Sequence, residues 1–292
     1  MYRLQVLASR IPIWIQLTRL DRPIGWIVLL WPTWIALVIA GHLDNHHQLK
    51  TWIIFTLGVI VTRSAGCVIN DLTDKDFDRH VKRTQLRPIT AGKVDSKEAL
   101  WLAFLLLLIA FALVLMTNLE TIFLSIIALF LAVIYPWLKR YTFWPQIGLG
   151  LAFSMAIPMV FAAHGQELSR IVWILFAANT FWTLSYDTFY AMVDRDDDLK
   201  IGVKSTAIKF GHFDLAAIAI IQIIALALFS YGLWLAELHW IFLIGVIGAI
   251  GFGIQQQIIA KDRLRENYLQ AFQESHRFGA ALFVGTILGI WY

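Results

Sequence analysis

Nine of the 20 acidic residues occupy two short segments of the sequence, NDLTDKDFD and DTFYAMVDRDDD. If each segment is helical, Asn70, Asp74 and Asp78 recur every four residues and share one face. In the second segment, spacings of seven and eleven place Asp187, Asp194 and Asp198 on one face as well. The acidic residues of the two segments are Asp71, Asp74, Asp76, Asp78, Asp187, Asp194, Asp196, Asp197 and Asp198.

Carboxylates four residues apart on a bare helix repel each other, so cations are expected among them. Carboxylate and amide oxygens suit Mg²⁺, which keeps several waters and commonly bridges to phosphate. Two facing sets of this kind predict a diphosphate held between metal ions. The alternative is that both segments are solvated loops. That explanation accounts for one such motif more readily than for two. Asp76, Asp196 and Asp197 point off the shared faces and are expected to be mostly solvated or charge-balancing.

Basic side chains follow both motifs and could contact diphosphate oxygens directly. Positive residues are also expected in the inner loops of a membrane protein, so both interpretations stay open for each of them. Tyr135 and Lys139, four residues apart, end an apolar segment on the same side. The basic candidates after the motifs are Lys82, Arg83, Arg87, Lys200 and Lys204.

Arg63 lies about two turns inside an apolar segment, where a charge is costly unless it is paired or lines a wet cavity. It precedes Asn70 by seven residues and should point to the same cavity as the acids. Either an internal aspartate or a carboxylate substrate would explain it, and the sequence slightly favours the internal pair. Arg22, just ahead of the first apolar segment, is a comparable candidate at the cytoplasmic rim.

The composition requires a membrane setting for these residues. Only 15% of the 292 residues are charged, 59% are hydrophobic and the mean hydropathy is +0.68, which excludes a disordered chain or a single soluble core. The single cysteine, Cys67, excludes a disulfide framework and a cysteine-based metal cluster. The formal charge of +4 does not indicate nucleic acid, because the basic residues lie in loops between apolar segments.

Hydropathy predicts an all-α polytopic membrane protein with about nine transmembrane helices. We expect one domain over residues 1–292, built from two four-helix units, about 20–140 and 145–257, plus a final helix. The long apolar stretch from Ala99 to Ile134 is expected to turn at Thr117–Glu120. The predicted spans cover residues 24–41, 51–70, 98–116, 120–136, 146–163, 171–190, 214–235, 239–257 and 278–291.

The distribution of Lys and Arg predicts a cytoplasmic N-terminus. With that orientation, all of the 24 basic residues except three lie in cytoplasmic segments. Lys50 and Arg170 fall on the outer side, and Arg63 falls inside a span. An odd number of spans then places Tyr292 outside. No signal peptide is evident at the N-terminus.

These motifs resemble those of the UbiA superfamily of intramembrane prenyltransferases. The NxxxDxxxD pattern matches Asn70, Asp74 and Asp78, the DxxxD pattern matches Asp194 and Asp198, and YxxxK matches Tyr135 and Lys139, all in the order of the family. The resemblance covers essentially the whole chain and implies helices around a central cavity. It is strongest to members that prenylate 4-hydroxybenzoate in ubiquinone biosynthesis, in the bacterial inner membrane.

The resemblance also implies roles for individual residues. The implied substrates are a polyprenyl diphosphate and 4-hydroxybenzoate, with Mg²⁺ as cofactor and lipid as the surroundings. Lys139, Lys82 and Arg87 would hold the diphosphate, either Arg63 or Arg22 would take the benzoate carboxylate, and Asp187 would orient the aromatic substrate or accept a proton. The other members of the substrate-binding set are Asn70, Arg83, Tyr135 and Lys204. The implied metal ligands are Asn70, Asp71, Asp74, Asp78, Asp194 and Asp198.

Two alternatives remain at this point. A related prenyltransferase could use another acceptor, such as a haem, chlorophyllide, naphthoate or homogentisate. A secondary transporter would also show repeated halves and intramembrane charge, but its polar residues would lie at the bilayer midplane. Here the acids cluster at one rim. The sequence does not give the length of the prenyl tail, the number of metal ions or the oligomeric state.

Overall fold

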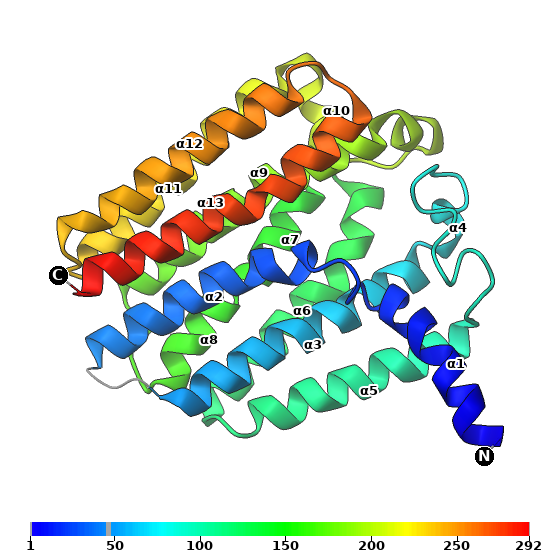
Figure 1. Cartoon of the computed structure of the whole chain (residues 1–292), viewed down its shortest axis with the longest axis horizontal. Coiled ribbons are helices and arrows are strands. Elements are labelled where there is room, and N and C mark those ends of the chain that lie inside the picture. The colour runs from blue at the N-terminus through cyan, green and yellow to red at the C-terminus, as the bar shows by residue number, and fades with distance from the viewer. Residues whose placement is uncertain (1, 45–47, 292) are drawn as a thin grey trace.

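The structure, a computed structural model, is all-α over the residues that it describes, 2–44 and 48–291, with side chains described from residue 9 onward (Figure 1). Long helices run roughly along one direction and form a single bundle. The α-helices are α1 (Tyr2–Leu17), α2 (Ile24–Leu43), α3 (Leu49–Thr73), α4 (Lys75–Asp78), α5 (Ser96–Val114), α6 (Leu119–Tyr141), α7 (Pro145–Ser154), α8 (Ala156–Ala163), α9 (Arg170–Ile201), α10 (Thr206–Phe210), α11 (Asp214–Leu235), α12 (Leu243–Ala260) and α13 (Arg265–Trp291).

Seven helical segments of the described chain are long and apolar enough to cross a membrane. The other two predicted spans coincide with α9 and α13, which are long enough but carry more polar and charged residues. Hydropathy alone therefore supports seven of the nine predicted spans. The seven segments are Ile24–Leu43, Leu49–Thr73, Ser96–Val114, Leu119–Tyr141, Pro145–Ala163, Thr206–Leu235 and Trp240–Ala260.

Local sequence signals explain several helix boundaries. The predicted turn between the two helices of the long apolar stretch is confirmed, since the Asn118 side chain caps α6 by accepting a hydrogen bond from the Thr121 N–H at 2.9 Å. The predicted span at 146–163 is instead two helices, α7 and α8, broken at Met155. Pro158 has no N–H to donate to the carbonyl of Ser154, which is the last residue of α7.

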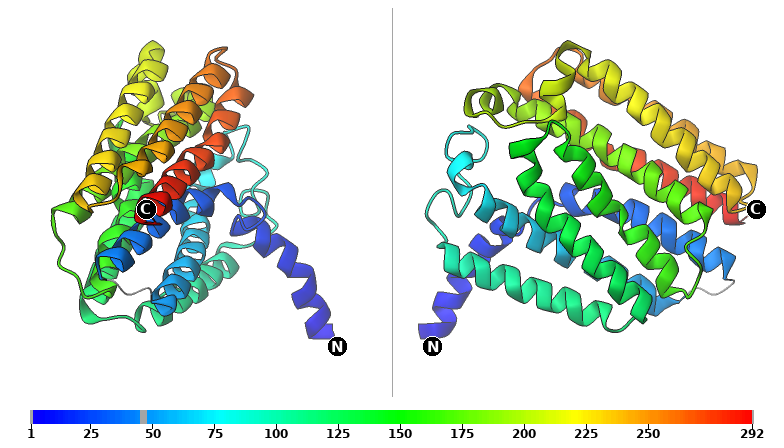
Figure 2. Two further views of the ribbon diagram at one scale, coloured as in Figure 1. Left: turned by 60° about the vertical axis from the view of Figure 1, so that its left-hand side comes forward. Right: turned by 180° about the vertical axis from the view of Figure 1, so that it is seen from behind.

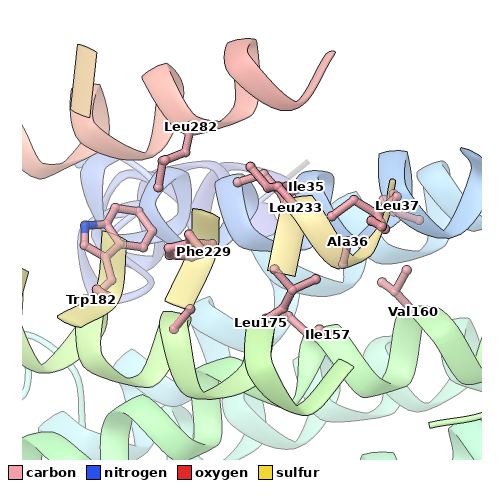
Figure 3. Close-up of a cluster of buried hydrophobic side chains, with 14 of the residues drawn as sticks. Ile35, Ala36, Leu37, Ile157, Val160, Leu175, Trp182, Phe229, Leu233 and Leu282 are labelled. Carbon is pink, nitrogen blue, oxygen red and sulfur yellow. The ribbon is translucent and has the colours of Figure 1, made fainter. Parts of the chain in front are cut away.

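Helix α9 runs through the middle of the bundle, and this explains its low hydropathy. It packs against α7, α8, α11 and α13, so its polar residues contact protein more than lipid. Trp182 on α9 stacks on Phe278 of α13 with ring centroids 5.7 Å apart. Figure 3 shows the surrounding core, where Trp182 and Leu175 meet Phe229 and Leu282.

The glycine-rich segment of α12 packs closely against α13. A Cβ at Gly245 would come within 2.6 Å of the Cα of Gly285, so only glycine permits this approach of the two backbones. The segment is therefore a helix-packing surface.

One end of the bundle gathers the segments that carry the acidic motifs. Helix α4, the loop of residues 79–95, α10 and the C-terminal end of α9 lie together at the right of Figure 1, and the end of α13 lies at the opposite side. Helix α1, which the spans predicted from sequence do not include, projects from the same end as α4 (Figure 2). The two motifs thus share one end of the molecule.

Candidate active site

The two acidic motifs meet at a small pocket of about 130 Å³. Helix α3 ends at Thr73 and α4 begins at Lys75, so the first motif is helical except at Asp74. The i to i+4 spacing nevertheless survives, because the Asp74 N–H donates to the Asn70 carbonyl at 2.9 Å and the Asp78 N–H to the Asp74 carbonyl at 2.8 Å. The second motif lies on the unbroken last turns of α9. The pocket is lined by Asn70, Asp74 and Asp78 from the first motif and by Asp187, Asp194 and Asp198 from α9.

Basic side chains neutralise most of these carboxylates. Lys139, at the end of α6, forms an ion pair with Asp74, which is 2% exposed. Arg83 binds Asp194 through two guanidinium nitrogens, with Nη2 2.5 Å from Oδ2. These are charge-assisted hydrogen bonds, which are the strong ones in proteins.

Arg87 joins the first motif to the loop that follows it. Its Nη1 lies 2.8 Å from Oδ2 of Asp78 and 3.0 Å from Oδ1 of Asp71. Asp71 also receives two hydrogen bonds from Arg19, at 2.7 and 3.0 Å. Asp71 lines the larger neighbouring cavity and not the small pocket, so it stands apart from the other predicted metal ligands.

The small pocket offers the donor set that a hard divalent cation requires. Oδ1 of Asp74 is buried without a hydrogen-bond partner, and burial raises the pKa of Asp78, which Asp74 and Asp71 raise further and Arg87 lowers. As the described side chains lie, no three acidic, histidine or cysteine residues are close enough to enclose a metal ion, because Lys139 and Arg83 hold two of the carboxylates. The residues present nevertheless fit Mg²⁺, which can bind through one or two carboxylates and water.

A larger cavity of about 1250 Å³ adjoins the pocket. Asn70, Arg83, Arg87, Tyr135, Asp187 and Tyr190 line both. Away from this shared boundary the walls of the larger cavity are largely apolar. They extend to Thr117, just after the C-terminal end of α5. The wall residues include Leu107, Phe111, Leu129, Val133, Phe153 and Met159.

Arg63 lines the larger cavity without an acidic partner. Its Nε donates to the Gly25 carbonyl at 3.3 Å, its Nη1 lies 2.9 Å from the sulfur of Cys67, and its guanidinium lies 5.9 Å from the Phe153 ring centroid. Within the described chain Arg63 forms no ion pair, so the internal aspartate pair that the sequence slightly favours is wrong. Asp71 and Asp74 are held by other basic residues, whereas Asp187 interacts with Arg63 through its charge without forming an ion pair among the described side chains. Arg63 is therefore available for an external anion.

A comparison with known proteins gives the family of this chain. A model of the UbiA prenyltransferase family matches residues 29–276. The chain belongs to this family. Relatives named 4-hydroxybenzoate octaprenyltransferase include one from Marinomonas sp. (strain MWYL1), 49% identical over 93% of this chain and 95% of the relative, and one from Pseudomonas fluorescens (strain Pf0-1), 50% identical over 94% and 92%.

Solved UbiA structures share the fold. A UbiA homologue from Aeropyrum pernix K1 in its apo form superposes with a TM-score of 0.76 at 25% identity, covering 91% of this chain and 96% of the homologue. A UbiA homologue from Archaeoglobus fulgidus bound to GPP and Mg²⁺ gives 0.70 at 21% identity, covering 94% and 99%. The UbiA-like arrangement predicted from the sequence is therefore confirmed.

The UbiA motif residues and most of the basic candidates line the two cavities, but four lie differently from expectation. Lys82 and Lys200 are exposed and line neither cavity. Lys204 lines the small pocket while its Nζ donates to the Tyr141 carbonyl at 3.2 Å and lies 5.6 Å from the Phe143 ring centroid. Arg22 lies at the mouth of the larger cavity with its side chain 71% exposed.

Two residues at the site of this UbiA protein were not predicted. Tyr190 lines both cavities and accepts a hydrogen bond from Nη1 of Arg83 at 2.6 Å. Its position three residues after Asp187 and four before Asp194 places it on the acidic face, a signal that the sequence offered. Arg19 comes from the connection between α1 and α2 with a φ of 59°, so helical spacing gave no indication of it.

Gly25 provides the space that Arg63 occupies. A Cβ at this position would lie 3.3 Å from Nη2 and 3.4 Å from Nε of Arg63. Gly25→Ala should therefore displace the guanidinium and weaken binding of a carboxylate ligand, by about tenfold if one charge-assisted hydrogen bond is lost. Isothermal titration with 4-hydroxybenzoate measures this. Gly251→Ala on α12, where a Cβ meets nothing within 4 Å and which lines neither cavity, is the control, and equal affinities of the two variants would contradict the role of Gly25.

Proposed function

We propose that this UbiA protein transfers an octaprenyl group from its diphosphate to carbon 3 of 4-hydroxybenzoate, a step of ubiquinone biosynthesis. The full-length relatives named for this activity support the acceptor and the donor. The observation that carries the proposal is the meeting of both acidic motifs at one pocket that opens on an apolar cavity containing an unpaired arginine. A lipid diphosphate needs the acidic pocket for its head group and the apolar cavity for its tail, and an aromatic acid needs the arginine for its carboxylate.

We further propose that nine helices cross the bacterial inner membrane, with the acidic end and the N-terminus on the cytoplasmic side. The seven apolar spans support a multi-pass arrangement, and α9 and α13 run alongside them in the bundle. The concentration of basic residues at the acidic end supports the orientation.

The donor diphosphate would bind at the small pocket. When bound, Mg²⁺ would be held by Asp74, Asp78, Asp194 and Asp198 with Asn70, and it would supply positive charge to the leaving diphosphate. Lys139, Arg83 and Arg87 are placed to exchange their present carboxylate partners for diphosphate oxygens, because each already lines the pocket. This exchange would free the carboxylates for the cation at the moment when the substrate arrives.

The acceptor would bind in the larger cavity beside the pocket. Arg63 would receive the benzoate carboxylate, and this anion would compensate a charge that otherwise lies unpaired among apolar walls. Asp187 lines the boundary between the two cavities, where the acceptor ring meets the prenyl carbon. There it would orient the phenol or receive the proton that the ring loses.

The apolar walls would hold the prenyl tail and exclude water. Loss of diphosphate from an allylic carbon leaves a cation that water would trap, so a dry cavity protects the reaction. The rings of Tyr135, Tyr190 and Phe153 line this space, and aromatic faces stabilise cations.

A direct assay tests the proposed function. Purified protein in detergent with Mg²⁺, geranyl diphosphate and radiolabelled 4-hydroxybenzoate should form a prenylated product, and EDTA should reduce the rate to background until Mg²⁺ is restored. Failure to form product, together with ion flux in liposomes, would contradict this proposal and favour a transporter. Product formed only with a naphthoate or homogentisate acceptor would identify a different prenyltransferase.

A further inference from the structure

The 79–95 loop between α4 and α5 brings Arg83 and Arg87 to the small pocket, and few contacts hold it against α9. The side chain of Arg83 binds Asp194. The loop backbone makes one hydrogen bond to α9 among the described residues, from the Lys82 N–H to Oδ2 of Asp197 at 3.3 Å. The position of the loop over the second motif therefore depends on two adjacent residues, Lys82 through its backbone and Arg83 through its side chain.

Asp197 also binds a residue outside the loop. Nη2 of Arg265, at the start of α13, lies 2.6 Å from the same Oδ2, and Nε of Arg265 donates to the Val193 carbonyl one turn earlier on α9. The Asp197 side chain is 15% exposed. Asp197 is therefore charge-balancing, one of the two roles expected for it, and its basic partner is a tertiary contact that helical spacing does not reveal.

The end of α9 has anchors that do not involve Asp197. Arg195 forms an ion pair with Asp214, which is fully buried at the start of α11 and also binds Arg263. Gly202 ends the helix in the left-handed conformation, with φ of 74°. Removing Asp197 should therefore loosen the contact of the loop with α9 at Lys82 while α9 keeps its shape.

We propose that Asp197 is a positioning residue that holds the 79–95 loop on α9, so that the guanidinium of Arg83 stays at the pocket that binds diphosphate. The inference rests on the proposed function. Asp197 lines neither cavity and acts through the backbone of Lys82. Asp194 and Asp197 are three residues apart on α9 and therefore lie side by side on one surface of the helix. They bind two consecutive residues of the loop, Arg83 and Lys82.

Loss of Asp197 should weaken binding of the donor and spare the acceptor. Arg87 would still anchor the loop to the first motif, but the segment around Arg83 would contact α9 through Arg83 alone. That segment should then sample positions away from the pocket, and the diphosphate must reorder it on binding. We expect the KM for geranyl diphosphate to rise about tenfold in Asp197→Ala. The kcat at saturating donor and the KM for 4-hydroxybenzoate should change less than twofold, because bound diphosphate restores the position of Arg83.

The test compares Asp197→Ala and the isosteric Asp197→Asn with Asp196→Ala. Asp196 is exposed on the same turn of α9 and loses the same charge, so the comparison isolates the contact. Steady-state kinetics gives the three parameters. Titration of each protein with geranyl thiolodiphosphate and Mg²⁺ gives the donor affinity without turnover, and Asp197→Glu should recover part of it.

Several results would overturn the inference. Donor affinity in Asp197→Ala equal to that in Asp196→Ala would do so, as would an equal rise of both KM values or a fall of kcat alone, which would indicate general damage. A wild-type protein that binds the thiolodiphosphate but makes no prenylated 4-hydroxybenzoate would contradict the proposed function instead, and the binding comparison would still decide the role of Asp197.

Discussion

Asp74→Asn and Asp194→Asn should each lower kcat by about a thousandfold. Each substitution removes one negative ligand for the cation that would neutralise the departing diphosphate. Asparagine keeps the volume of the side chain, whereas alanine at position 74 would leave the partly buried Lys139 without its partner, a change that is destabilising in itself. Single-turnover kinetics with geranyl diphosphate measures the effect on the chemical step.

The motifs contain their own controls. Asp76 and Asp196 are exposed acidic neighbours of the two residues, so Asp76→Asn and Asp196→Asn make the same chemical change outside the pocket. Both controls should retain the wild-type rate, and all four variants should express and elute as the wild-type protein does. Rates near wild type in Asp74→Asn or Asp194→Asn would refute the role of that carboxylate.

Arg63→Ala should raise the KM for 4-hydroxybenzoate by roughly a hundredfold, corresponding to about 2 to 3 kcal/mol for charge-assisted hydrogen bonds lost in a largely apolar cavity. The KM for the diphosphate should change little, because Arg63 lines only the larger cavity. Steady-state kinetics with each substrate varied in turn separates the two effects.

Two controls identify the group that Arg63 recognises. Arg22→Ala should leave the acceptor KM near the wild-type value, since the side chain of Arg22 is mostly exposed. 4-Hydroxybenzamide, which lacks the negative charge, should bind the wild-type protein poorly and should lose no further affinity in Arg63→Ala. An unchanged acceptor KM in Arg63→Ala would show that Arg63 is only structural. A large rise of the acceptor KM in Arg22→Ala would show that Arg22 binds the carboxylate instead.

The helices and the acidic face could be predicted because they depend on local periodicity. Apolar segments of span length gave the positions of the long helices, and i to i+4 spacing gave the shared face of Asn70, Asp74 and Asp78. That spacing held even though α3 ends at Thr73, because the backbone hydrogen bonds continue past the break. The internal repetition of two four-helix units stays a prediction.

Pairings across the bundle could not be predicted from local periodicity. The sequence favoured an acidic partner for Arg63, but Arg19 and Arg87 hold Asp71, and Lys139 holds Asp74. Which basic residue reaches which carboxylate depends on how the loops fold over the end of the bundle. For the same reason, the contact of Asp197 with Arg265, 68 residues away in the chain, could not be predicted.

Manganese binding tests most directly whether both motifs hold one cation site. Mn²⁺ can replace Mg²⁺ at oxygen ligands, and its electron paramagnetic resonance signal reports the bound fraction in the presence of geranyl thiolodiphosphate. Bound Mn²⁺ is expected in the wild-type protein and in Asp196→Asn, and its affinity should fall strongly in Asp74→Asn and, separately, in Asp194→Asn. Undiminished Mn²⁺ affinity in either of these two variants would contradict a site shared by the two acidic motifs.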